Sequence, residues 1–447
     1  MSNDLGSAIL AALAVSAMAT IGYACRRDWL APSAFGPLLW VFYLSLPLIA
    51  ARDYSVSGNA VWKIAFLLSS LQLGALAGEG IGRQIVINGG KGTPRPAFSE
   101  ALALRLLWMS GVCALVAMIG TLYLAFSSLS VYGLQTSIAG LLGLGPHLAA
   151  ERYVAGRSYS TVTRALLLWP YPAALLGGLS YPCLRSRRHQ LVAAAAFIPA
   201  LLLSIVTAIR ATTLFAVACW ATAYIAVTVC SSRGSYRIWR AGFVLKAAVG
   251  LGIAILFALT IQVLRAGIEQ AGDLASTWEH LRPGFLGYLA AFSEWDRSGP
   301  EKLSWGFYTF AGVFDMIGVR SRDIGVYATS VNLSGVDTNI YTVFRGLIED
   351  FGFAGALVSL SIVGFIAGWA YRQVRAGQSW YCLILAGYYA CCIWSPIASF
   401  FVYNGLVLAW LVGAVALWWP LWDMDRRMTR SMRVAQTLGA KVNRQVI

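Results

Sequence analysis

Three arginines have the side-chain type and the position to bind a phosphate group. Arg210 stands in a short polar segment between two apolar stretches. Arg265 follows a third apolar stretch, and Arg345 precedes a fourth. A guanidinium group binds phosphate oxygens through two parallel hydrogen bonds and stays charged at every relevant pH. If the apolar stretches cross a membrane, the three arginines can form a clamp for a pyrophosphate near one membrane face.

Each arginine also has a simpler interpretation. Arg210 can extend its side chain toward lipid phosphates, and Arg265 can act as an interfacial anchor at the end of a helix. Arg345 stands four residues before Glu349 and can pair with it along a helix. These alternatives remain open from the sequence.

The composition places the chain in a membrane. Hydrophobic residues make up 58% of its 447 residues and charged residues only 12%. A hydrocarbon core about 30 Å thick requires roughly 20 apolar residues per helical span, which gives about eleven spans here. They run approximately over 5–24, 34–50, 61–78, 102–126, 162–184, 191–208, 211–230, 242–263, 352–371, 380–398 and 402–422. The apolar runs are continuous and do not alternate, so we expect an all-α polytopic membrane protein and not a barrel.

The basic residues predict the orientation. Asp4 precedes the first span whereas Arg26 and Arg27 follow it, which indicates an uncleaved anchor with its N-terminus outside. With eleven crossings, 21 of the 34 basic residues fall on the inner side. We therefore expect a bacterial inner-membrane protein with a periplasmic N-terminus and a cytoplasmic C-terminus. The net charge of +15 then reflects topology and anionic lipid in the bilayer, and no nucleic-acid partner is expected.

The predicted organisation has four parts. Residues 1–263 contain eight spans and a short interfacial segment at 127–161, 264–351 form one large periplasmic loop, 352–422 contain three spans, and 423–447 are a basic cytoplasmic tail. The loop carries 11 of the 19 carboxylates together with many aromatic residues, a mixture suited to sugar binding. No cysteine falls in it, so we expect no disulfide framework.

Metal-ligand patterns are weak. Glu294 and Asp296 could chelate a cation, but two carboxylates at this spacing occur readily by chance. The three histidines, His147, His189 and His280, are far apart in the sequence. We expect neither a metal nor a cofactor.

One segment resembles a known family. Residues 338–355, Thr-Asn-Ile-Tyr-Thr-Val-Phe-Arg-Gly-Leu-Ile-Glu-Asp-Phe-Gly-Phe-Ala-Gly, run directly into a predicted span. They look like the signature that follows the large periplasmic loop in O-antigen polymerases of the Wzy type, a family with a GT-C-like membrane fold. Arg210 and Arg265 resemble two further arginine positions of that superfamily.

The resemblance implies polymerisation of undecaprenyl-pyrophosphate-linked repeat units into O-antigen or exopolysaccharide, without a metal. Arg210, Arg265 and Arg345 would stabilise the pyrophosphate leaving group, and Asn339, Tyr341 and Thr342 would bind substrate. A base would assist the attacking hydroxyl, and Asp337, Asp350 and His280 are its candidates. A partner that regulates chain length is implied by the resemblance as well.

Two other functions remain open. The related O-antigen ligases, which transfer glycan to lipid A-core, usually have a histidine where this chain has Thr338, and this difference favours the polymerase. A flippase or exporter of lipid-linked glycans is the non-enzyme alternative. Carriers usually place charged groups on broken helices near the membrane midplane, whereas these arginines are expected at the outer boundary.

Overall fold

The structure is a computed structural model of the whole chain. It describes residues 2–88, 98–153, 159–231, 274–299, 302–319 and 329–418, together with Tyr327 and a few positions between 256 and 263.

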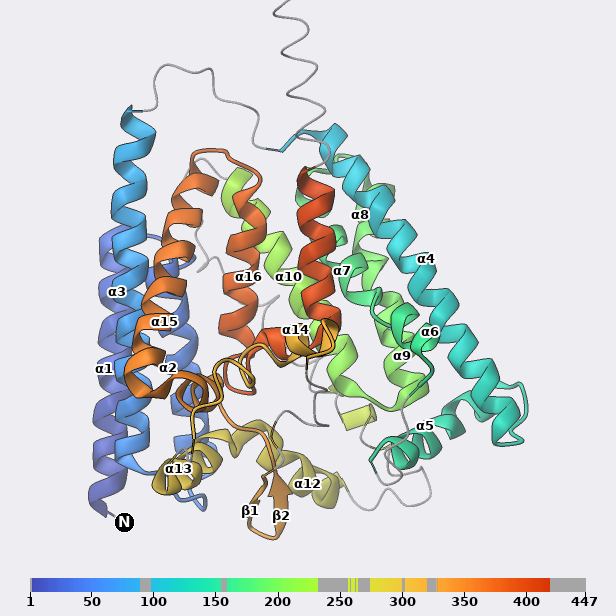
Figure 1. The fold of residues 1–447 in the computed structure, drawn as a ribbon, viewed down its shortest axis with the longest axis horizontal. Helices are drawn as coiled ribbons and strands as arrows, with labels where there is room; N and C mark the ends of the chain where they lie inside the picture. The colour runs from blue at the N-terminus through green and yellow to red at the C-terminus, as the bar shows by residue number, and fades with distance from the viewer. Residues whose placement is uncertain are drawn as a thin grey trace, which may run out of the picture.

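The described chain is predominantly helical (Figure 1). Its α-helices are α1 (Ser2–Arg26), α2 (Pro32–Ala50), α3 (Gly58–Asn88), α4 (Glu100–Val131), α5 (Ile138–Tyr153), α6 (Thr161–Leu166), α7 (Pro170–Ser180), α8 (Arg187–Ala194), α9 (Ile198–Thr207), α10 (Arg210–Ser231), α12 (Leu274–Leu286), α13 (Tyr288–Ser298), α14 (Ala311–Met316), α15 (Val343–Arg375) and α16 (Tyr381–Trp394), followed by a helix at Asn404–Trp418. Short 3₁₀ turns are η1 (Tyr181–Cys183), η2 (Ala195–Phe197) and η3 (Phe400–Val402). One antiparallel hairpin joins β1 (Val331–Leu333) to β2 (Val336–Thr338), with Asn332 opposite Asp337.

Seven helices in the described residues are long and apolar enough to cross a membrane, as expected for an all-α membrane protein. They match seven predicted spans: Asp4–Arg26, Pro32–Ala50, Gly58–Ile81, Glu100–Val131, Arg187–Thr207, Arg210–Ser231 and Val343–Arg375. The predicted count of about eleven and the GT-C-like topology stay predictions. Most of the predicted span 242–263 lies outside the described residues.

Three predicted spans form shorter helices than expected. The stretch 162–184 is divided into α6, α7 and η1. Pro170 begins α7 and has no N–H to continue the hydrogen bonding of α6. The stretch 380–398 forms α16, which ends at Trp394, two residues before Pro396, and the stretch from 402 forms the Asn404–Trp418 helix.

Close backbone contact joins α3 to α15. Each helix carries two glycines four residues apart, Gly74 and Gly78 on α3 and Gly364 and Gly368 on α15. A Cβ atom added at any of the four would lie 2.0–2.1 Å from a backbone oxygen of the other helix. Small residues at this spacing let membrane helices approach closely, and backbone and side-chain polar groups then bond across the seam. Here the Ser70 hydroxyl lies 2.6 Å from the Ser361 hydroxyl.

The two ends of the helical bundle differ. At the end where α1 begins, α5, α12, α13 and the β1–β2 hairpin gather (Figure 1). At the opposite end α1 finishes with Arg26, α8 begins with Arg187, and α15 finishes with Arg372 and Arg375 in its last turn. The predicted separation of the N-terminus and the long loop from these basic residues is therefore present in the fold. Which end faces the periplasm stays a prediction.

Ion pairs fasten α12 to the connection between α2 and α3, and α13 to α3. The guanidinium of Arg282 binds both oxygens of Asp53 and lies over the ring of Tyr54, 5.0 Å from its centroid. Lys63 pairs with Asp296 at 2.6 Å. Together α12, α13 and the hairpin form a cap at one end of the helical bundle.

Candidate functional site

The segment 338–355 forms the beginning of α15 together with a sharp kink. Gly352 has φ 69° and ψ 171°, so the helical residues 343–351 are set at an angle to the long part of α15 that follows. A side chain is strained at such a positive φ, which accounts for glycine there. The segment therefore forms a short helical arm between the cap and the helical bundle.

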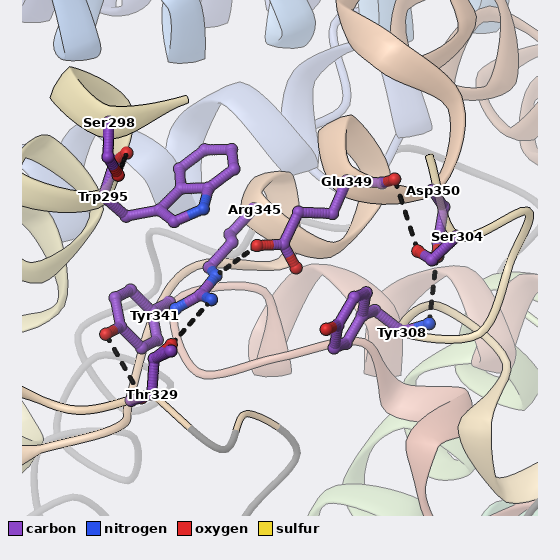
Figure 2. Close-up of polar contacts among 9 residues, drawn as sticks. All are labelled: Trp295, Ser298, Ser304, Tyr308, Thr329, Tyr341, Arg345, Glu349 and Asp350. Carbon is purple, nitrogen blue, oxygen red and sulfur yellow. Dashed lines mark hydrogen bonds and ion pairs between the residues drawn. The ribbon is translucent and has the colours of Figure 1, made fainter. Parts of the chain in front are cut away.

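Arg345, on this arm, is enclosed by aromatic rings and is only 4% exposed. Its Cζ lies 3.9 Å from the ring centroid of Tyr341, 4.1 Å from that of Tyr327 and 5.5 Å from that of Trp295. Aromatic faces attract a cation, and the attraction is stronger when both groups are desolvated. We call Arg345 and these three rings the arginine cage, and Figure 2 shows Arg345 with two of them, Tyr341 and Trp295.

Hydrogen bonds orient the guanidinium within the arginine cage. Its Nε donates to Glu349 Oε1 at 3.0 Å, and its Nη2 donates to the Thr329 hydroxyl at 2.9 Å (Figure 2). The i,i+4 pair with Glu349, which the sequence left open as the simpler interpretation, is therefore present. Arg345 holds two parts of the long loop, Trp295 and the pair Tyr327 and Thr329, against the start of α15.

Two polar atoms beside this ion pair are buried without a hydrogen-bond partner in the described structure. They are Arg345 Nη1 and Glu349 Oε2. A buried donor or acceptor left unpaired costs about 1–3 kcal/mol, so an unpaired donor and acceptor on one ion pair indicate a place for a small polar group. A hydroxyl group suits it, because a hydroxyl both donates and accepts hydrogen bonds.

Asp350, the next residue, has a structural role. Its carboxylate accepts from the Ser304 hydroxyl at 2.5 Å, from the Tyr308 N–H at 3.0 Å and from the Thr309 N–H at 2.6 Å. The residue is fully buried. Both oxygens are thus engaged in fixing the loop 304–309, and this arrangement does not favour Asp350 as a base for an incoming hydroxyl.

Burial raises the pKa of the Tyr327 phenol well above its ordinary value, and the negative charge of Glu349 raises it further. Tyr327 therefore stays neutral and presents its ring face to Arg345.

Arg210 lies at the junction of the cap and the helical bundle. The turn between α9 and α10 contains Ala208 in the left-handed conformation, with φ 50°, and Arg210 is the first residue of α10. The half-buried guanidinium lies under α12, with Cζ 5.9 Å from the ring centroid of Phe285. A Cβ atom added at Gly284 would lie 3.8 Å from Arg210 Nη2 and 3.4 Å from Ile340, so Arg210 and the segment 338–342 meet the same part of α12.

The amino end of α10 adds a second positive element. Unpaired N–H groups and the helix dipole make such an end attractive to anions. The Ser204 hydroxyl accepts from the Thr213 N–H at 3.1 Å and fixes the turn. A cationic side chain on a helix amino end at the edge of the bundle is suited to a phosphate.

The other predicted site residues are distributed as follows. Tyr341 is buried in the arginine cage, and Thr342 is buried at the start of α15 with its hydroxyl unpartnered in the described structure. Asn339 is half-buried next to them. Asp337 is exposed on the hairpin and accepts from Asn332 at 2.8 Å. Arg265 and the side chain of His280 lie outside the described residues.

Glu294 and Asp296, which could chelate a cation by their spacing, bind different partners. Glu294 pairs with Arg297, and Asp296 pairs with Lys63. Among the described residues no group of three or more His, Cys, Asp or Glu is placed to hold a metal ion.

No sequence pattern selects Thr329 or separates Tyr327 and Trp295 from the other loop aromatics. They stand 16, 18 and 50 residues before Arg345, and no helical or strand spacing relates them to it. Only the contact of Arg345 with Glu349 could be predicted, because residues four apart are neighbours on a helix.

Comparisons with protein-family models, with curated proteins and with solved structures find no match to this chain.

Proposed function

We propose that this protein polymerises glycan repeat units linked to undecaprenyl pyrophosphate at the outer face of a bacterial inner membrane. The observation that carries the proposal is Arg210 on the amino end of α10, half-buried beneath α12 at the boundary between the cap and the membrane helices. A lipid pyrophosphate presents a double negative group at such a boundary. The resemblance of 338–355 to the polymerase signature supports the same reaction.

In this reaction an acceptor sugar hydroxyl attacks the anomeric carbon of the donor glycan. The bond from that carbon to the pyrophosphate oxygen breaks, and lipid pyrophosphate leaves with the electron pair. Arg210 and the N–H groups at the start of α10 stabilise the negative charge that develops on the leaving oxygen.

Glu349 is the carboxylate that we assign to the acceptor. Its Oε1 is held by Arg345, and its buried Oε2 has no partner in the described structure. An acceptor hydroxyl there donates to Oε2, accepts from Arg345 Nη1, and loses its proton to Glu349 during attack. Asp337, Asp350 and His280 stay predictions for this role.

The test uses purified protein in detergent with lipid-linked repeat units extracted from the cells that make it, and follows products as a ladder on a gel. We expect a ladder with the wild type in the presence of EDTA and none with Arg210→Ala. Arg210→Lys retains the charge but not the bidentate geometry, so we expect a ladder about 10- to 100-fold slower. The matched control is Arg185→Ala, an exposed arginine at the opposite end of the bundle, which should leave the ladder unchanged.

Three outcomes contradict the proposal. If Arg210→Ala makes a normal ladder, pyrophosphate is not bound at this arginine. If no ladder forms but added lipid A-core becomes glycosylated, the protein is a ligase, and transport across vesicles without elongation would indicate a flippase.

A further inference from the structure

A cavity of about 320 Å³ lies where α4, α5 and α6 meet. Its floor includes Ser128, Leu148 and Thr163, all buried, whereas Tyr123 and Val131 on α4 are exposed at its rim. Figure 1 shows α5 and the adjoining end of α4 at the same end of the bundle as α12 and α13. The cavity is therefore on the side that we propose to face the substrate.

The lining has an unusual chemistry for a membrane protein. Of the 11 described residues that line it, 7 carry a hydroxyl group, namely three serines, three tyrosines and one threonine. Glu151 is the one carboxylate among them, and none of them is Lys or Arg. A site for phosphate would present cations, whereas a carboxylate among hydroxyls repels anions and accepts hydrogen bonds from a neutral ligand with many hydroxyls.

The volume of the cavity and its tyrosine rings also suit a neutral ligand with many hydroxyls. Binding pockets for small molecules start at about 300 Å³ and combine apolar faces with a few polar groups. Tyr132 is held by stacking on His147, with ring centroids 4.8 Å apart and an interplanar angle of 20°. Tyrosine rings supply flat apolar faces for the C–H groups of a sugar ring, and their hydroxyls supply polar contacts.

The cavity is also close to Arg210. On α5, Gly145 packs against the α9–α10 turn, where an added Cβ atom would lie 3.0 Å from Ala208 Cβ. Leu148, in the cavity lining, follows Gly145 by one turn of α5, and Arg210 follows Ala208 by two residues. Helix rise and Cα spacing then limit the separation of the cavity from Arg210 to roughly 20 Å. An oligosaccharide attached to a pyrophosphate at Arg210 can reach it.

We propose that this cavity is a sugar-binding subsite that holds a neutral sugar of the lipid-linked glycan. The inference rests on the proposed function for the identity of the glycan, and on the lining alone for the class of ligand. The same polyhydroxyl chemistry occurs in a free repeat-unit oligosaccharide and in the glycerol headgroup of a phospholipid, and the experiment separates these two sources.

The test measures saturation-transfer NMR signals in a detergent without a sugar headgroup. The probe is the mixture of oligosaccharides released by mild acid from the lipid-linked repeat units of the cells that make the protein. We expect sugar-proton signals with the wild type, and signals at least fivefold weaker with Ser127→Trp, which places an indole in the cavity. Glu151→Gln, which keeps the shape but removes the charge, should weaken them as well.

The matched control is Ser130→Trp on the same helix, since Ser130 is exposed and is not part of the lining. It should bind as the wild type does. Equal signals from wild type and Ser127→Trp would overturn the proposal, and so would displacement of the sugars by an equal concentration of glycerol 1-phosphate, which would indicate a headgroup site. Failure of the proposed function is distinct, because sugar binding in the cavity would then persist without a ladder.

Discussion

At the scale of single residues, the site depends on two adjacent buried acids with different tasks. Glu349 shares the arginine cage with Arg345 and keeps one oxygen unpartnered in the described structure, whereas Asp350 uses both oxygens to hold the loop 304–309. The two residues are adjacent in the sequence, so the sequence does not show this difference. It arises because their side chains point in different directions from the helical arm and meet different partners.

Removing one member of the Arg345–Glu349 pair should destabilise the protein more than removing both. A single change, Arg345→Met or Glu349→Gln, leaves a charge buried without its partner, at a cost of about 3–5 kcal/mol. The double change to Met and Gln removes both charges and should cost less than the sum of the single changes. Thermal unfolding in detergent measures all three, and strictly additive losses would contradict a buried ion pair.

Asp350→Asn should loosen the loop 304–309 without removing the helix. The amide nitrogen cannot accept from an N–H group, so at least one of the three hydrogen bonds to this side chain is lost, at a cost of about 1–3 kcal/mol. Limited proteolysis should then cut the loop faster than in the wild type. Asp337→Asn, an exposed change on the hairpin, serves as the control, and equal cleavage of the two variants would argue against this role of Asp350.

At the scale of elements, the α3–α15 contact positions the helical arm that carries Arg345. The four glycines allow the two backbones to touch, and any larger side chain there must push the helices apart. Because α15 continues directly from the arm through Gly352, a shift of α15 would also move the arginine cage.

Gly364→Leu should therefore reduce both stability and assembly of the site. Its Cβ atom would start 2.0 Å from the Leu71 carbonyl oxygen, and overpacking of this kind costs about 1–3 kcal/mol or more. Gly80→Leu on α3 is the matched control, because nothing lies within 4 Å of an added Cβ atom there. Unfolding temperatures in detergent compare them, and an equal decrease in both variants would exclude close packing as the cause.

At the scale of the whole molecule, the cap and the start of α1 share one end of the bundle, and the described clusters of arginine lie at the other (Figure 1). The bias of basic residues toward the cytoplasm then predicts that the cap faces the periplasm. The proposed function requires this orientation, because a lipid-linked glycan would meet the cap only after it has crossed the membrane.

Cysteine labelling in intact cells tests the orientation. Asp4→Cys at the start of α1 and Glu279→Cys on α12 should both react with a maleimide that cannot cross the inner membrane, since both positions are exposed. Arg187→Cys, at the start of α8, should react only after the cells are broken. Labelling of Arg187→Cys in intact cells without labelling of Glu279→Cys would reverse the predicted orientation.

The sequence by itself determined the class of protein and the position of most long helices. Length and apolarity suffice for this, because a span must satisfy its backbone within itself whatever its neighbours are. It did not predict that the stretch 162–184, which composition alone counted as one span, is divided into shorter helices at Pro170. The i,i+4 spacing of Arg345 and Glu349 also indicated that these two residues could form an ion pair.

Only the tertiary structure decided which loop residues surround Arg345, that Asp350 is fully engaged, and that Arg210 lies beneath α12. These relations join residues 16 to 75 positions apart, as in Arg345 with Thr329 and Arg210 with Phe285, and no local periodicity records them. They arise from how the helices pack and from where the loop returns to the bundle. Helix formation depends on local hydrogen bonds, whereas a site made from several elements depends on their packing.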